Sequence, residues 1–231
     1  MEIDLEAVLN WKRKKWGMFS ASLIHHLLIP GTADKKTGLK DSFGKGALTY
    51  IHQIASQSYI EFNDEEDGAE SFSMKEGKRR EPISAGHYQR IIGLDNMVYF
   101  GGQPEFFKYN EHSGCSPDLV VWKGETNWIA SFGAEFKNPK RDTHMDYLIE
   151  IKTWEDLKEK CPDYYAQCQF CMMTLKADLW HWVSHHEYYP TKDRLLIIEV
   201  PANKKFQDEL DVKLSMAIKK KNEFVELLKN R

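Results

Sequence analysis

The sequence predicts an α/β protein in which a central mixed β-sheet is flanked by helices. Two observations predict this class: apolar residues recur at helical spacing through about the first 95 residues, and short β-branched and aromatic runs follow from Met97 onward. With 231 residues, 42% of them hydrophobic, the chain can bury one sizeable core. We expect one domain over residues 1–231, with a helical part at about 1–95 and a sheet with further helices at about 96–231.

Helices are expected where apolar residues recur every three or four positions. The first begins near Leu5, and Ser20 or Ser22 has the residue type of an N-cap for the second. A later helix contains Pro82, which can kink it. In chain order, we expect helices at residues 5–16, 20–28, 44–59, 71–92, 164–175 and 204–229.

Strands are expected in the second half, where short apolar runs are separated by Gly, Pro and Asn turns. We expect these strands to form one sheet. They lie at residues 97–100, 106–109, 119–122, 128–136, 179–184 and 194–200.

The charge balance limits how this chain could contact nucleic acid. A formal net charge of −3 argues against a protein that coats nucleic acid nonspecifically, because such binding depends on Lys and Arg neutralising phosphates. A local basic groove on an acidic body is still compatible with the sequence. Basic residues cluster at positions 12–15, 78–80, 137–141 and 219–221.

Targeting and cysteine content indicate a soluble, cytoplasmic protein without membrane contact. The apolar runs, such as Leu195–Val200, are too short to cross a bilayer, and the N-terminus lacks a basic-then-apolar export signal. Four cysteines in a chain of this length do not form a disulfide scaffold, so we expect most of them to be small buried hydrophobes.

Two segments place acidic residues on neighbouring strands. Asp118 follows Pro117 at the start of one strand, and Glu135 and Lys137 end the next, otherwise apolar one. Because side chains alternate along a strand, Glu135 and Lys137 point to the same face and Phe136 to the opposite one. Two adjacent carboxylates repel each other unless a cation lies between them, and hard oxygen ligands suit Mg²⁺ or Mn²⁺.

Lys137 adds the third part of a phosphodiester-hydrolysing site. It would lie beside the metal, where it could hold or deprotonate the attacking water, or stabilise charge that develops on the phosphate. The alternative is an ordinary surface ion pair between Glu135 and Lys137. An unpaired charge at the end of an apolar strand would be costly, which favours the functional interpretation.

Four blocks in fixed order resemble the lambda exonuclease and YqaJ-type viral recombinase family of PD-(D/E)xK nucleases. The resemblance implies a restriction-endonuclease-like core. The blocks are Lys15–Ser22, Gly77–Glu81, the two catalytic strands Gly114–Asp118 and Glu135–Lys137, and Tyr165–Met172.

The same resemblance implies a role for particular residues. The metal ligands would be Asp118, Glu135, the backbone carbonyl of Phe136 and, from the second block, Glu81. Catalysis would involve Asp118, Glu135, Lys137 and Gln167, with Gln167 supporting the site. Contacts to the DNA 5'-phosphate would come from Lys15, where the family commonly has Arg, and from Ser20 and Ser22.

The resemblance also implies the activity and the partners. We expect a metal-dependent 5'-to-3' exonuclease that degrades one strand of linear duplex DNA with one or two Mg²⁺ or Mn²⁺ ions per site. Its setting would be phage-type recombination in a bacterial or phage-infected host cell, beside a single-strand annealing recombinase. A homotrimeric ring would place a basic channel inside an acidic exterior.

Two other functions share these residues. An endonuclease of the same superfamily, such as a restriction or junction-resolving enzyme, would use Asp118, Glu135 and Lys137 without a 5'-phosphate pocket. A nuclease-dead DNA-binding protein could keep the fold, but it would have no need of such costly clustered charges.

Some residues have simpler interpretations. Glu81 could pair with Lys78, Arg79 or Arg80 on a helix surface, and Gln167 could be an interior amide. Of the two glutamines on this helix, we expect Gln169 to be the structural one. The pair Cys168 and Cys171 does not have the order expected of an iron–sulfur site. Three histidines near one strand suggest zinc, but no ligand set is complete at close spacing, so we expect surface residues at His181, His185 and His186.

Overall fold

Five strands form the mixed sheet at the centre of the computed structural model, which describes residues 4–32, 42–64, 72–124 and 129–231. The strand order is β2-β5-β6-β7-β8, and only the β6–β7 pair is parallel. The first residue of the expected helix at 71–92 and the first residue of the expected strand at 128–136 lie outside the described residues. The strands are β2 Met97–Tyr99, β5 Leu119–Trp122, β6 Ala130–Lys137, β7 Leu179–His185 and β8 Leu195–Pro201.

A second, three-stranded sheet contains the strand that we expected to join the main one. Strand β3 (Phe107–Asn110) pairs with β4 (Ser113–Cys115), and β4 pairs in parallel with β1 (Phe19–Ser20). The expectation of one sheet is therefore wrong. The close approach of β3 to β4 depends on Gly114, because a Cβ there would lie 2.2 Å from the carbonyl oxygen of Phe107.

The helices agree with the sequence in most places. One correction is the 20–28 segment: it is a 3₁₀ helix, η1, and Ser20 precedes it without a side-chain capping bond. Two helices, α4 and α5, were not expected. The helices are α1 Leu5–Lys15, η1 Ala21–Leu28, α2 Lys45–Tyr59, α3 Phe72–Ile92, α4 Arg141–Glu150, α5 Trp154–Lys160, α6 Pro162–Leu175, η3 Thr191–Asp193 and α7 Lys204–Lys229.

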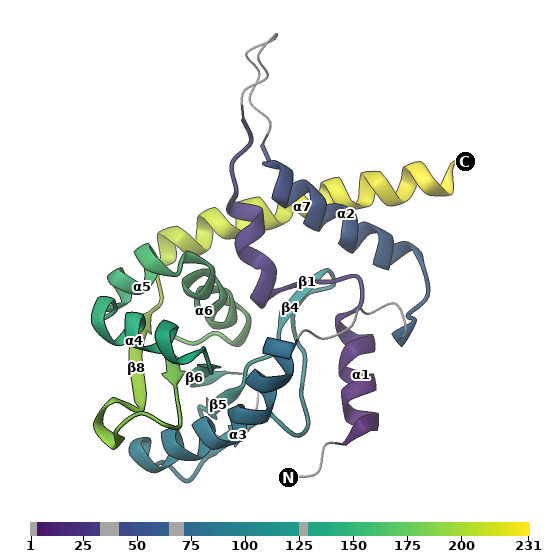
Figure 1. Cartoon of the computed structure of the whole chain (residues 1–231). Helices are drawn as coiled ribbons and strands as arrows, with labels where there is room; N and C mark the ends of the chain where they lie inside the picture. Colours follow the sequence, from purple (N-terminus) through teal and green to yellow (C-terminus); the bar gives the residue numbers. More distant parts are fainter. Residues whose placement is uncertain (1–3, 33–41, 65–71, 125–128) are drawn as a thin grey trace.

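The two faces of the sheet are buried against different helices (Figure 1). Val120 and Trp122 of β5 belong to the larger core with α6, whereas Leu119 and Val121 belong to a smaller core with α3. This is the alternation expected for a strand that is buried on both faces. Side chains of β5 and β6 can therefore be assigned to the α6 face or the α3 face by their parity.

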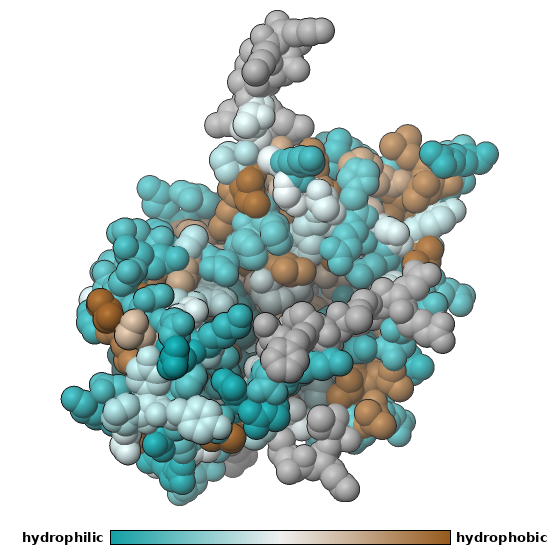
Figure 2. All heavy atoms as spheres, in the orientation of Figure 1, coloured by the Kyte–Doolittle hydropathy of each residue, from teal (hydrophilic) through white to brown (hydrophobic). Residues whose placement is uncertain are grey.

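The outer surface is polar on the face shown in Figure 2, where hydrophobic atoms form separate patches among hydrophilic ones. In Figure 1, α2 lies along α7, whose C-terminal end projects from the body of the protein. Among the described helices, none is both long enough and apolar enough to span a membrane.

Candidate active site at the ends of β5 and β6

Asp118 directly precedes β5, and Glu135 lies on β6, the strand that the sequence predicts to be adjacent and that pairs with β5. Leu119 of β5 is paired with Ala134 of β6 in antiparallel register. Asp118, the residue before Leu119, therefore lies opposite Glu135. Asp118 Oδ2 accepts a hydrogen bond of 2.6 Å from the backbone N–H of Phe136. By parity both carboxylates belong to the α6 face, while the side chain of Phe136 packs in the core on the α3 face.

Lys137 is held by three groups on this face. Its Nζ atom lies 2.9 Å from Glu135 Oε1 and 3.2 Å from Gln167 Oε1, and 4.8 Å from the centre of the Tyr164 ring. Burial lowers the pKa of Lys137, but the charges of Glu135 and Asp118 outweigh burial and raise it above its ordinary value. The two carboxylates therefore favour the charged form of Lys137, which is suited to stabilising negative charge.

Glu81 approaches the same acids from α3. Its Oε1 atom accepts a 3.1 Å hydrogen bond from the Tyr99 hydroxyl. Burial and the charge of Glu135 raise the pKa of Glu81 to about 7, against smaller opposing effects that include Lys78. The alternative pairing with arginine does not occur: the neighbouring arginines 79 and 80 form ion pairs with acids at positions 76 and 187 instead.

The pKa of Asp118 is raised for the same reasons. Burial raises its pKa well above the ordinary value, and the charges of Glu135 and Glu81 raise it further. A cation placed beside Asp118 and Glu81 would favour the charged form of both. Such mutual repulsion is typical of a site that holds a positive ion.

The residues fit a divalent cation in their chemistry. Glu135 Oε2 is buried without a hydrogen-bond partner, so one hard oxygen ligand is available. Within the described residues, no three His, Cys, Asp or Glu side chains converge closely enough to hold an ion as they stand. The reason is that each carboxylate turns to its own donor: Asp118 to Phe136 N, Glu135 to Lys137, and Glu81 to Tyr99.

The two glutamines of α6 have different roles. Gln167 is 6% exposed, and its side-chain oxygen contacts Lys137. Gln169 is fully buried and binds three groups away from the acids: it donates to the Pro201 carbonyl and accepts from Asn203 N and Gln207 Nε2. The prediction that Gln169 is the structural glutamine is confirmed.

Known proteins share both the sequence pattern and the fold. Residues 39–178 match the family model of the YqaJ-like viral recombinase domain. The chain belongs to this family. The matched segment contains Glu81, Asp118, Glu135, Lys137 and Gln167, whereas the Lys15–Ser22 block precedes it.

Solved structures of exonucleases have the same fold as this YqaJ-like chain. An alkaline exonuclease from Laribacter hongkongensis superposes with a TM-score of 0.73 at 18% identity over 96% of each chain. The same enzyme in complex with dAMP gives 0.74 at 17% identity, again over 96% of each. A phage-related exonuclease from Haemophilus somnus 129PT gives 0.68 at 15% identity, over 91% of this chain and 96% of the other.

No curated protein matches the sequence. The family resemblance and the α/β fold class expected from the sequence are both confirmed. Membership in a viral recombinase family, on a fold shared with exonucleases, supports a nuclease.

The three residues expected at a 5'-phosphate lie at the N-terminal side of this YqaJ-like chain. Ser20 and Ser22 have their hydroxyl oxygens 3.3 Å apart. Lys15 Nζ lies 4.0 Å from the centre of the Trp11 ring, and Trp11 Nε1 donates a 2.6 Å hydrogen bond to Ser116 Oγ. Trp11 thus links α1, which ends at Lys15, to the segment that precedes Asp118.

Three histidines that we expected at the surface lie in β7 or directly after it. His181, His185 and His186 are 5%, 1% and 6% exposed, so the expectation of surface residues is wrong. The physical reason is that β7 is an interior strand, paired with β6 and β8 and covered on both faces. His181 Nδ1 lies 2.6 Å from the Tyr88 hydroxyl.

Sequence reasoning missed three aromatic side chains of the site. Tyr99 contacts Glu81, Tyr164 lies under Lys137, and Trp11 contacts Ser116. Large aromatic side chains are common in cores, and nothing in the local sequence around these three indicates a role in a site. The signal available for Tyr99 was its position at the end of an expected strand, beside the strand of Asp118.

Proposed function

We propose that this chain is a divalent-metal-dependent exonuclease that degrades one strand of linear duplex DNA from its 5' end during phage-type recombination. The observation that carries the proposal is the placement of Lys137 Nζ 2.9 Å from Glu135, on the strand whose Phe136 N–H donates a hydrogen bond to Asp118. Two acids and a cationic lysine form a compact group suited to phosphodiester hydrolysis. The exonuclease fold agrees with this chemistry.

In the proposed reaction, Asp118, Glu135, Glu81 and the carbonyl of Phe136 hold one or two Mg²⁺ or Mn²⁺ ions. A bound ion of this kind polarises the scissile phosphate and lowers the pKa of its water. Lys137, fixed by Gln167, stabilises the negative charge that develops on the phosphate oxygens.

The direction of degradation would come from the N-terminal side. Lys15 supplies a positive charge, and the paired hydroxyls of Ser20 and Ser22 can donate hydrogen bonds to a terminal 5'-phosphate. The proposal includes a homotrimeric ring around the duplex, an annealing recombinase that receives the exposed strand, and action in the cytoplasm.

The first experiment is digestion of linear and covalently closed circular duplex DNA, with the label at either the 5' or the 3' end. We expect Mg²⁺-dependent release of the 5' label from linear DNA, intact circles, and no reaction in EDTA. Cut circles would instead identify an endonuclease. Early release of the 3' label would refute the direction alone, and the absence of any cleavage would indicate a DNA-binding protein.

A further inference from the structure

The backbone hydrogen bonding of helix α3 is interrupted next to Glu81, the proposed metal ligand. Pro82 lies inside α3, directly after Glu81. Proline has no backbone N–H, so the helical bond from residue 82 to the carbonyl of residue 78 cannot form, and the residue before a proline is itself disfavoured in a helix. The backbone of α3 therefore does not fix the position of Glu81 by itself.

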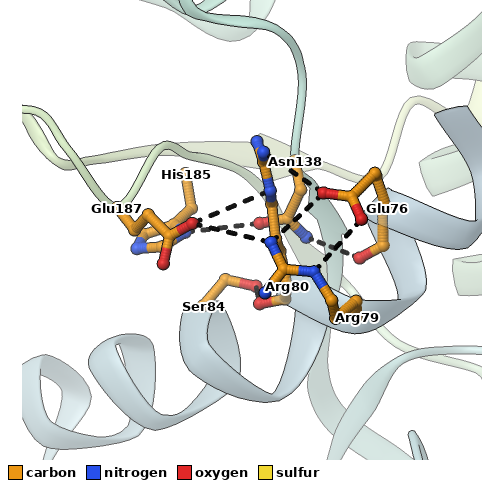
Figure 3. Close-up of polar contacts among 8 residues, drawn as sticks. Glu76, Arg79, Arg80, Ser84, Asn138, His185 and Glu187 are labelled. Carbon is orange, nitrogen blue, oxygen red and sulfur yellow. Dashed lines mark hydrogen bonds and ion pairs between the residues drawn. The ribbon is translucent and has the colours of Figure 1, made fainter.

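The two parts of α3 are attached to the sheet in different ways. Beyond Pro82, Ala85 and Tyr88 pack in an apolar core with Leu119 and Phe136. Before Pro82, the described part of α3 is joined to the sheet by polar contacts with residues that follow β6 and β7 (Figure 3), and Glu81 itself accepts a hydrogen bond from a residue of β2. The location of Glu81 thus depends on polar contacts on one side and apolar contacts on the other.

The first polar attachment is a chain of hydrogen bonds. His87 Nδ1 lies 3.1 Å from His185 Nε2, His185 Nδ1 lies 3.3 Å from Asn138 Oδ1, and Asn138 Nδ2 donates to the Gly77 carbonyl at 3.5 Å. All four residues are satisfied if His87 and His185 each carry a proton on Nδ1. The chain joins α3 on both sides of Glu81 to the residue that follows Lys137.

The second attachment is ionic. Arg80, next to Glu81, lies 3.8 Å from Glu187, which follows β7, and 3.4 Å from Glu76 on α3 itself. The side chains of Arg80 and Glu187 are only 21% and 19% exposed, so water screens this pair less than a surface pair. Only the Glu187 contact connects the helix to another element.

We propose that Asn138, His185 and Glu187 form a polar clasp that positions Glu81 for metal binding. The clasp opposes the repulsion that Asp118 and Glu135 exert on Glu81. The inference rests on the proposed function, because it assigns Glu81 to the metal. Asn138, His185 and Glu187 are positioning residues: they act on α3 and are not ligands.

The test is binding of Mn²⁺ to the DNA-free protein, measured from the electron paramagnetic resonance signal of the free ion. We expect Asn138→Ala to weaken Mn²⁺ binding about 10-fold, the size of effect seen when outer partners of ligands are removed. Glu187→Gln should weaken it in the same direction. Glu76→Gln is the matched control, since it removes the same charge beside Arg80 without releasing α3 from the sheet, and its Mn²⁺ affinity should equal that of the wild type.

A double variant shows whether the clasp acts through Glu81. In a Glu81→Gln background, Asn138→Ala should cause no further loss of Mn²⁺ affinity, because the ligand that it positions is already gone. Thermal unfolding of every variant separates this effect from general destabilisation, which would lower Tm without moving the affinity of the folded protein.

The outcomes distinguish the two proposals. Wild-type affinity in Asn138→Ala, an equal loss in the Glu81→Gln background, or an equal loss in Glu76→Gln would each overturn the clasp while leaving the nuclease intact. Failure of the wild type to bind Mn²⁺ and to cleave linear DNA would overturn both.

Discussion

The ends of β6 and β7 are neighbouring buried polar regions with opposite electrostatic character. At the end of β6, Glu135 has a buried oxygen without a partner, and the pKa values of Asp118 and Glu81 are raised. At the end of β7, His185 has a partner at both ring nitrogens. The difference indicates that repulsion among like charges marks the candidate reactive centre, whereas a neutral His185 and the oppositely charged Arg80–Glu187 pair mark its proposed support.

The largest expected effect comes from a substitution among the acids at the end of β6. Asp118→Asn should reduce cleavage by about 1000-fold, because it removes an anionic ligand for the catalytic ions. Asn can still accept the bond from Phe136 N, and one repelling charge is lost, so Tm should not fall. The measurements are the rate of label release and thermal unfolding. A wild-type rate would exclude Asp118 from the site.

Removing the cation at the same site should have the next largest effect. Lys137→Met retains much of the side-chain length but not the charge, and we expect a loss of about 100-fold in kcat from missing transition-state stabilisation. Single-turnover digestion with saturating enzyme isolates this step from DNA binding. An unchanged rate would show that Lys137 serves only to neutralise Glu135.

The region at the end of β7 should make the stability of the protein depend on pH. Burial, then the nearby His87, His144, Arg194 and His186, lower the pKa of His185 from 6.5 to about 4. In this pH range His185 therefore binds a proton in the unfolded chain but not in the folded chain. The free energy of unfolding falls as pH decreases from about 6.5 towards 4. From pH 7 to pH 5 this histidine should cost about 2 kcal/mol of unfolding free energy.

The measurement is urea unfolding at pH 7 and pH 5. His185→Gln removes the titrating group, so its unfolding free energy should decrease about 2 kcal/mol less than that of the wild type over this range. Equal decreases in both proteins would mean that His185 is not held neutral in the folded state.

The smallest expected effect lies outside both regions. Lys15→Ala should reduce the preference for 5'-phosphorylated over 5'-hydroxyl ends by about 10-fold, the size of one exposed charge-assisted hydrogen bond. Cleavage of 5'-hydroxyl ends serves as the internal control and should be unchanged. An equal slowing on both substrates would contradict a pocket for the 5'-phosphate.

The reactive centre could be predicted from sequence more fully than its support. The two-residue period of a strand placed Glu135 and Lys137 on one face, and the pairing of β5 with β6 confirmed Asp118 beside them. Glu81 was identified only through family resemblance. The contact between Asn138 and His185 joins residues 47 apart, and no local pattern records such a meeting.

Missed elements have equally physical causes. Helix α4 buries only His144 among its residues, so it has no apolar stripe to recognise, and α5 has only seven residues. Strands β1 and β4 have two and three residues, too few for alternation to be seen. Strand β3 lies in a separate sheet because it pairs with β4, which in turn pairs with β1, and both of these strands are too short to predict from the sequence.

The contacts that hold the reactive side chains span short stretches of the chain. Tyr99 and Glu81 are 18 positions apart, Phe136 and Asp118 are also 18 apart, and Lys137 and Gln167 are 30 apart. Residues 81–167 thus contain the candidate catalytic side chains and these contacts, whereas His185 and Glu187 of the proposed clasp lie beyond this segment. Helices α1 and α7 lie outside this segment, so substitutions confined to them leave all three contacts in place.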